Sequence, residues 1–495
     1  MSSTARAEPR PRLAPNASAA VRERGWEITV WSAMTLWTIV LFVVARDAYS
    51  SFRVGRFDLG NMVQAVWSTA HGRPLEMTAG ATGEQMLRLG AHADPFLVLL
   101  APVWLIWPSP LALALAQIAV VALGALPVFW LARRHCGSER VAGLLALGYL
   151  AYPWVATSAV AAIHPVTFAI TFFLLCIWFL EIDRLALFGT CAVLAMSTGE
   201  LMGLPILGLG IWFALARGRR CAGAVIAAGG VAWTLAAVYF VVPAFAREHS
   251  LFYGFYDQIG GSPQGVLRTL GTHPGAVLGA LLEPRDVAYL VWLGLPLLGL
   301  FVLAPGLAAV AIPQLLANGL SDFRSMTDPR YHSVAAVIPF LIAATVLGVA
   351  RLRTSRQPVA AAGVLVCSAT LALAVGPWGR AAGMTPLGGR ETPSPARSEA
   401  LRQAIAAVPQ DAAVTTTNAA GARLSARTHV YSVPILGHAD WAVVDLGDPW
   451  VVSERSPILT SHPEVVAAFV RRLRSSAGWR EVRADDGVLV FRRLP

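Results

Sequence analysis

The feature that most constrains this chain is a series of long apolar runs divided by short polar connections. About eleven of these runs approach the roughly 20 residues that a helix needs to cross a bilayer. They fall at about 25–45, 110–132, 140–159, 164–181, 185–197, 199–216, 221–243, 286–303, 305–319, 333–350 and 357–376. The runs at 185–197 and 305–319 are short enough to be broken or re-entrant helices. The pattern predicts an α-helical polytopic membrane protein with about eleven transmembrane helices.

The composition excludes the main alternatives to a membrane protein. Hydrophobic residues make up 56% of the 495 residues and charged residues only 14%, whereas soluble domains carry about 25% charged residues. A soluble enzyme this apolar has too few polar side chains to cover its surface, and a disordered chain has too little apolar surface. All 39 basic residues are arginine, and they follow the ends of apolar runs. We therefore expect the lipid bilayer as a partner and no nucleic acid.

The positions of the arginines predict the topology. Arginine-rich connections at 133–140, 217–220 and 351–356 alternate with the apolar runs so that all lie on one side, together with the arginines before the first run. Short connections of this kind mark the cytoplasm. The first run has no small-residue cleavage site after it, so it is expected to remain as an anchor. The chain is therefore predicted to cross the cell membrane many times, with its N-terminus inside and its C-terminus outside.

Four parts follow from this topology. They are a cytoplasmic tail at 1–24, a transmembrane domain at 25–376 with an external loop at 46–94, a Gly- and Pro-rich linker at 377–396, and an external domain at 397–495. The last part is polar and alternates helix and strand signals. Helices are predicted at 397–407 and 463–474, and strands at 412–417, 428–433, 440–445, 479–484 and 488–492. A small extracytoplasmic α/β domain is the expected result.

Ionisable residues near the membrane are costly and by default mark a function or pair with one another. Asp58 directly precedes an amphipathic helical stretch in the first external loop. One interpretation is an N-cap, in which the carboxylate accepts a bond from a free backbone amide. The other is a general base held just outside the membrane, and the two are compatible. We expect Asp58 to be the catalytic residue.

Three further polar groups occur beside apolar runs in the sequence. His92 and Asp94 are two residues apart ahead of Pro95, so both side chains can reach one site. They are expected to bind a divalent metal such as Mg²⁺ or Mn²⁺, or to form a hydrogen-bonded pair. The alternative is that Asp94 caps a turn and His92 lies on the surface. His164 begins one run at the membrane interface. Glu200 has no basic neighbour and faces either water or a cavity.

The densest polar cluster beside the membrane is at 322–332. It contains Arg324, Arg330, Tyr331 and His332 together with two aspartates. The guanidinium group of arginine can donate two parallel hydrogen bonds to phosphate oxygens, and an aromatic neighbour can stack on a sugar. A solvated loop with mutual Asp–Arg pairs is the alternative.

These segments also resemble a known group of proteins. The chain resembles an uncharacterised family of multi-spanning prokaryotic membrane proteins over roughly 50–350. The motifs that carry the resemblance are Phe57-Asp58-Leu59-Gly60, His71-Gly72, Leu89-Gly90-Ala91-His92 with Asp94-Pro95, His164-Pro165 and Tyr331-His332. That family is similar in layout to the GT-C glycosyltransferases, which use polyprenyl-phosphate sugars. In such enzymes an Asp of the first external loop is the general base, and the resemblance carries this role onto Asp58. Where the family typically has Lys-Glu-Asp, this chain has Gly199-Glu200-Leu201.

The predicted function is transfer of a sugar from a polyprenyl-phosphate carrier to a cell-envelope glycan acceptor at the outer face. Besides Asp58, the residues expected to bind substrate are His71, His164, Glu200, Arg324, Arg330, Tyr331 and His332. A transporter or flippase, with His164 and Glu200 inside a pathway, is one alternative. A non-catalytic membrane scaffold is another.

Overall fold

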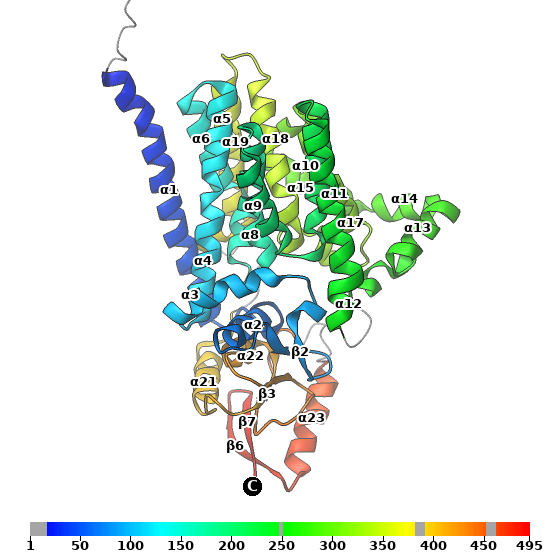
Figure 1. The fold of residues 1–495 in the computed structure, drawn as a ribbon. Coiled ribbons are helices and arrows are strands. Elements are labelled where there is room, and N and C mark those ends of the chain that lie inside the picture. The colour runs from blue at the N-terminus through cyan, green and yellow to red at the C-terminus, as the bar shows by residue number, and fades with distance from the viewer. Residues whose placement is uncertain (1–16, 247–250, 382–391, 452–461) are drawn as a thin grey trace, which may run out of the picture.

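The computed structural model describes residues 17–246, 251–381, 392–451 and 462–495. A bundle of helices forms one end of the molecule and a smaller α/β domain the other, with the external loop layered between them (Figure 1). The longest bundle helices are α1 (Ala17–Ser50), α8 (Pro165–Glu181), α11 (Arg220–Ala236) and α19 (Gln357–Val375). The others that pack in the bundle are α4 (Pro110–Leu123), α5 (Ala125–Cys136), α6 (Glu139–Ala151), α7 (Pro153–Val160), α9 (Leu185–Met196), α10 (Gly203–Ala216) and α18 (Ile338–Ala350).

The predicted number of spans is not confirmed. Four helical segments in the described ranges are long and apolar enough to cross a membrane: Gly25–Ser50, Pro110–Cys136, Arg220–Phe245 and Gln357–Val375. A fifth is possible if α6 and α7, which are bent by 47° at their junction, count as one span. Five further apolar helices are only 10–17 residues long. The protein is therefore a membrane protein with four or five clear spans and a set of shorter helices.

The region 286–319 shows why run length overestimates spans. The predicted break at 305–319 is present, since α16 (Pro305–Ala308), η9 (Ala309–Ala311) and α17 (Ile312–Gly319) replace one helix. The run at 286–303 is broken as well, into α15 (Pro284–Gly294), η7 (Leu295–Leu297) and η8 (Leu300–Leu303). Leu298 and Gly299 between the last two have φ of 54° and 63°, and a left-handed backbone ends a helix.

The two ends of the bundle differ in charge. Helix α1 starts at the end far from the α/β domain and finishes beside that domain (Figure 1). The arginine-rich connections α5–α6, α10–α11 and α18–α19 also lie at the far end. There Arg134 and Arg217 both bind the Glu181 carboxylate at the end of α8. The three arginine-rich connections thus share one end of the bundle, as the predicted topology requires, and the assignment of that end to the cytoplasm stays a prediction.

The α/β domain contains every predicted helix and strand in its described part. Its elements are α21 (Pro395–Ala406), β3 (Val414–Thr416), β4 (Val430–Ser432), β5 (Trp441–Asp445), α23 (Pro463–Ser475), β6 (Trp479–Asp485) and β7 (Val488–Arg493). The sheet order is β4-β3-β5-β7-β6, with β3 parallel to β4 and β5, and with β7 antiparallel to β5 and β6. Helix α22 (Asn418–Leu424) was not predicted. Residues 382–391 of the predicted linker lie outside the described residues.

The external loop folds into a layer against the α/β domain. It contains a π-helix, η1 (Arg56–Gly60), then α2 (Asn61–Ala70), the hairpin of β1 (Glu76–Thr78) and β2 (Gln85–Leu87), and η2 (Arg88–Gly90). The chain then returns to the bundle through η3 (Pro95–Leu100) and α3 (Ala101–Ile106). Leu59, Val63 and Val66 of this layer share a buried apolar cluster with Ala422 of α22, so the two parts pack as one body.

Candidate active site

Asp58 has a free carboxylate. It lies within η1, and the N-cap of α2 is Gly60, with no side-chain capping bond. The side chain is partly exposed, and among the described residues no hydrogen bond or ion pair engages its carboxylate. The capping interpretation is therefore wrong. A carboxylate that is not occupied by a protein partner remains able to accept a proton from a bound molecule.

His164 and His332 lie face to face beside Asp58. Their ring centroids are 3.8 Å apart at an interplanar angle of 20°. Burial lowers the pKa of His164 from 6.5 to about 4, although the nearby Asp58 carboxylate acts in the opposite direction. Burial and the neighbouring His164 also lower the pKa of His332. Both imidazoles are thus neutral near pH 7, and each offers one N–H donor and one acceptor nitrogen.

Tyr331 extends this group into a row of aromatic rings. Its ring lies 4.0 Å from that of His332, and Phe323 and Phe255 continue the row at centroid distances of 5.9 and 4.8 Å. Burial and the Asp58 carboxylate raise the pKa of the Tyr331 hydroxyl, which is therefore a proton donor at neutral pH. The interplanar angles between successive rings are 16°, 77° and 40°, so the row combines stacked, edge-on and tilted contacts.

His92 contacts Glu200 on the other side of the group. The His92 Nδ1 atom lies 3.1 Å from Glu200 Oε1, and Glu200 Oε2 accepts the Ala93 backbone N–H at 3.2 Å. Besides burial, electrostatic interaction with Arg88 and His92 contributes to the lowered pKa values of His164 and His332. His92 thus lies close enough to the stacked pair to belong to the same site. Glu200 is thus bound to the external loop, and 21% of its side chain remains exposed.

Asp94 has a different partner from His92. Its carboxylate forms a buried ion pair with Arg88, at 2.8 Å from Nη2 and 3.0 Å from Nε. Burial raises the pKa of Asp94, and Arg88 counteracts this. Since Asp94 is bound by arginine and His92 by Glu200, the two do not present a shared pair of ligands. No set of three His, Cys, Asp or Glu within the described ranges is arranged to hold a metal ion, so the residues present do not fit the expected Mg²⁺ or Mn²⁺.

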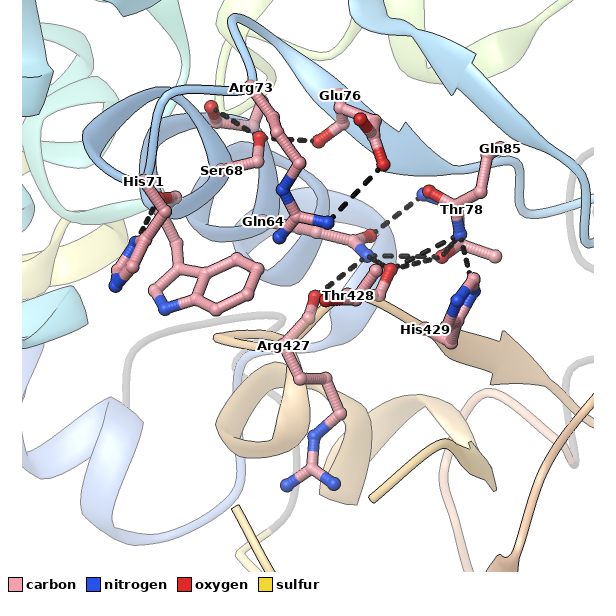
Figure 2. A network of polar contacts seen from close by, with 12 residues as sticks. Gln64, Ser68, His71, Arg73, Glu76, Thr78, Gln85, Arg427, Thr428 and His429 are labelled. Carbon is pink, nitrogen blue, oxygen red and sulfur yellow. Dashed lines mark hydrogen bonds and ion pairs between the residues drawn. The ribbon is translucent and has the colours of Figure 1, made fainter. Parts of the chain in front are cut away.

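The other three expected substrate-binding residues differ in the partners of their side chains. His71 is exposed at the end of α2, where its Nδ1 lies 2.7 Å from the Trp67 carbonyl oxygen, beside the contacts between α2 and the α/β domain (Figure 2). The guanidinium of Arg330 is bound to Asp328 at 2.7–3.1 Å, as the solvated-loop alternative predicted. Arg324 is exposed in η10 (Arg324–Thr327), and no carboxylate pairs with it in the described part of the chain.

Sequence reasoning missed three residues of the site. Gln117 of α4 accepts the His164 backbone N–H at 2.9 Å and donates to the carbonyls of Ala162 and Ala159 at 2.6 and 3.0 Å, so it holds the turn that carries His164. As the only polar side chain in α4 it was a detectable signal. Arg88 and Tyr256 gave no local signal. Partial burial, and to a smaller extent the Glu200 carboxylate, raise the pKa of Tyr256 to about 12, and its hydroxyl donates to the Ala317 carbonyl at 3.1 Å.

Comparisons with known proteins bear on the fold. Residues 48–490 match the family described as "Predicted membrane protein (DUF2079)". Two crystal structures of ArnT from Cupriavidus metallidurans are similar, one bound to undecaprenyl phosphate and one in the apo state, at TM-scores of 0.53 and 0.51. The likeness covers 94% and 92% of this chain and 98% of each ArnT chain, at 14% identity, so it shows a shared fold. No curated protein matches the sequence.

Proposed function

Because the chain belongs to the DUF2079 family of predicted membrane proteins and has the fold of ArnT over almost its whole length, we propose that it is a GT-C-type membrane glycosyltransferase. It transfers a sugar from a polyprenyl-phosphate carrier to an acceptor of the cell envelope. The α/β domain and the site lie on the outer side of the cell membrane. The presence of undecaprenyl phosphate in one ArnT crystal supports a carrier of this lipid class.

The observation that carries the proposal is the free Asp58 carboxylate beside the stacked His164 and His332. In the transfer, Asp58 takes the proton of an acceptor hydroxyl as the hydroxyl oxygen attacks the anomeric carbon of the sugar. The bond from that carbon to the phosphate oxygen breaks, and the polyprenyl phosphate leaves with the bonding electrons. Neutral imidazole N–H groups can donate hydrogen bonds to the phosphate as its charge develops.

Arg324 is a better candidate than Arg330 for binding the departing phosphate. Both are in the segment that carries Tyr331, but the Arg330 fork is bound to Asp328. Arg324 keeps all five of its donors available, since no carboxylate of the described residues pairs with it. The row of aromatic rings from Phe255 to His332 supports stacking of the sugar.

The test is Asp58→Asn, with Asp486→Asn in the exposed β6–β7 turn as the matched control. We expect Asp58→Asn to lower transfer of a radiolabelled undecaprenyl-phosphate sugar by about 10²- to 10⁴-fold, the usual contribution of a general base. Its thermal midpoint and expression should match those of the control. An unchanged transfer rate, or unchanged envelope glycans in a deletion strain, would contradict the proposal. Normal glycans with lost solute uptake would instead favour a transporter.

A further inference from the structure

The segment that carries Asp58 rests directly on the α/β domain. The backbone N–H of Phe57 donates to Oδ1 of Asn418, the first residue of α22, at 3.0 Å. A Cβ atom added to Gly55 would lie 2.2 Å from Asn418 Nδ2, and one added to Gly60 would lie 2.4 Å from Ser425 Oγ. A side chain at either end of η1 would therefore require Asn418 or Ser425 to shift. The backbone before and after Asp58 is therefore held in contact with α22.

Arg56 provides a second, directional attachment. Its side chain is completely buried, and its guanidinium donates to Ser432 Oγ at 2.7 Å, to the Val430 carbonyl at 2.8 Å and to the Thr78 carbonyl at 2.9 Å. Two of these acceptors belong to strand β4. A buried arginine that forms no ion pair within the described ranges is costly, and hydrogen bonds from its planar fork compensate only in one orientation. This geometry fixes the direction in which the chain runs from Arg56 to Asp58.

The network in Figure 2 holds the other side of the same segment. Gln64 of α2 donates to the carbonyls of Arg427 and Thr428 at 3.1 and 3.0 Å and accepts the Thr78 backbone N–H at 3.0 Å. Gln85 of β2 donates to the same Thr428 carbonyl at 3.2 Å. The connection between α22 and β4 is thus bound by α2 and by the β1–β2 hairpin. Attachments to the α/β domain thus precede and follow Asp58, and Thr78 of the hairpin accepts from Arg56 and donates to Gln64.

We propose that the α/β domain is the scaffold that positions Asp58 in the site, with Arg56 and Asn418 as positioning residues. The inference rests on the proposed catalytic role of Asp58. Its physical basis is that a displacement of about 1 Å of a reacting group can lower a rate by about 10²-fold. Loss of either attachment should therefore reduce kcat, and leave the KM for the lipid-linked sugar near its wild-type value, because neither residue contacts the substrate.

The test uses three variants of the full-length protein in detergent. Asn418→Ala removes the acceptor of the Phe57 N–H. Asn418→Asp keeps it and loses no other bond, since Asn418 Nδ2 has no partner among the described residues. Arg56→Lys keeps the positive charge but removes the planar guanidinium that donates to Ser432, Val430 and Thr78. Arg402→Lys, on the exposed face of α21, is the matched control for that exchange.

Two readouts separate this inference from the proposed function. Hydrogen–deuterium exchange of residues 55–61 should rise in Asn418→Ala and Arg56→Lys, and return toward wild type in Asn418→Asp. Transfer should fall about 10-fold or more in the first two through kcat. Unchanged exchange at 55–61 in both variants, or raised exchange with full transfer, would overturn the inference. A wild-type protein without transferase activity overturns the proposed function, while the exchange data still decide whether the α/β domain holds the Asp58 segment.

Discussion

His92 and Glu200 are 108 residues apart in sequence, yet His92 Nδ1 lies 3.1 Å from Glu200 Oε1. The second carboxylate oxygen of Glu200 accepts the Ala93 backbone N–H. The contact ties the end of the external loop to the turn between α9 and α10. Glu200 thereby has a structural partner in this chain.

The first prediction concerns the coupling of these two residues. Glu200→Gln and His92→Ala should each lower the thermal midpoint, because a hydrogen bond to a charged group is worth about 1.5–3 kcal/mol. The double variant should be less destabilised than the sum, with a coupling of about 0.5–3 kcal/mol. Thermal unfolding of the four proteins in detergent measures this cycle. Additive losses would show that the two side chains do not interact.

Parts of the site could be predicted from sequence. The arginine pattern placed Asp58, His164, Tyr331 and His332 at one end of the bundle. In the structure they lie together, and the segment that carries Asp58 contacts Asn418 of the α/β domain. Charge at a membrane boundary is a local property of the sequence. Most strands of the α/β domain were also predictable, because their alternation of apolar and polar residues is local.

The pairings inside the site could not be predicted. His-x-Asp suggested that His92 and Asp94 act together, but Asp94 turns toward Arg88 and His92 toward Glu200. Which partner a side chain meets depends on packing between segments that are distant in sequence. The predicted helix over 286–303 was broken for a related reason, since apolar composition does not reveal the left-handed backbone at Leu298 and Gly299.

A second prediction follows from the buried ion pair of Arg88 and Asp94. Arg88→Met leaves the Asp94 carboxylate buried without its partner, which typically costs about 3–5 kcal/mol. The double variant Arg88→Met/Asp94→Leu removes both charges and should recover much of this loss. Thermal midpoints of the single and double variants provide the measurement. If the double variant is no more stable than Arg88→Met, the cost does not come from the unpaired carboxylate.

The third prediction is a loss of stability on acidification. The folded pKa of His164 is about 4, below the ordinary value of 6.5, so between these values the unfolded chain binds more protons. Stability is therefore full above pH 6.5 and is lost as the pH falls toward 4, by an amount on the order of 3 kcal/mol. His332 adds to the loss in the same direction.

Thermal midpoints measured from pH 7 to pH 4 test this dependence. His164→Asn should have a lower thermal midpoint than the wild type at pH 7, because the stacked ring is gone. Its thermal midpoint should fall less than that of the wild type on acidification. His273→Asn, at an exposed histidine, is the control and should follow the wild type. Equal pH slopes in all three proteins would rule out His164 as a source of the acid sensitivity.

The last prediction tests the contact between α22 and η1 through its packing. A Cβ atom at Gly421 would lie 2.8 Å from the Arg56 Cβ and 3.2 Å from Thr416 Cγ2, so Gly421→Ala must push α22 away from η1. Overpacking of this kind costs about 1–3 kcal/mol, although alanine is the better helix former by about 1 kcal/mol. Gly275→Ala in α14 (Pro274–Leu281) is the matched control, because nothing lies within 4 Å of its added Cβ, and it should be neutral or stabilising. We expect Gly421→Ala to lower the thermal midpoint and to raise hydrogen exchange at 55–61. A variant as stable and as protected as Gly275→Ala would show that α22 and η1 are not packed against each other in the membrane-embedded protein.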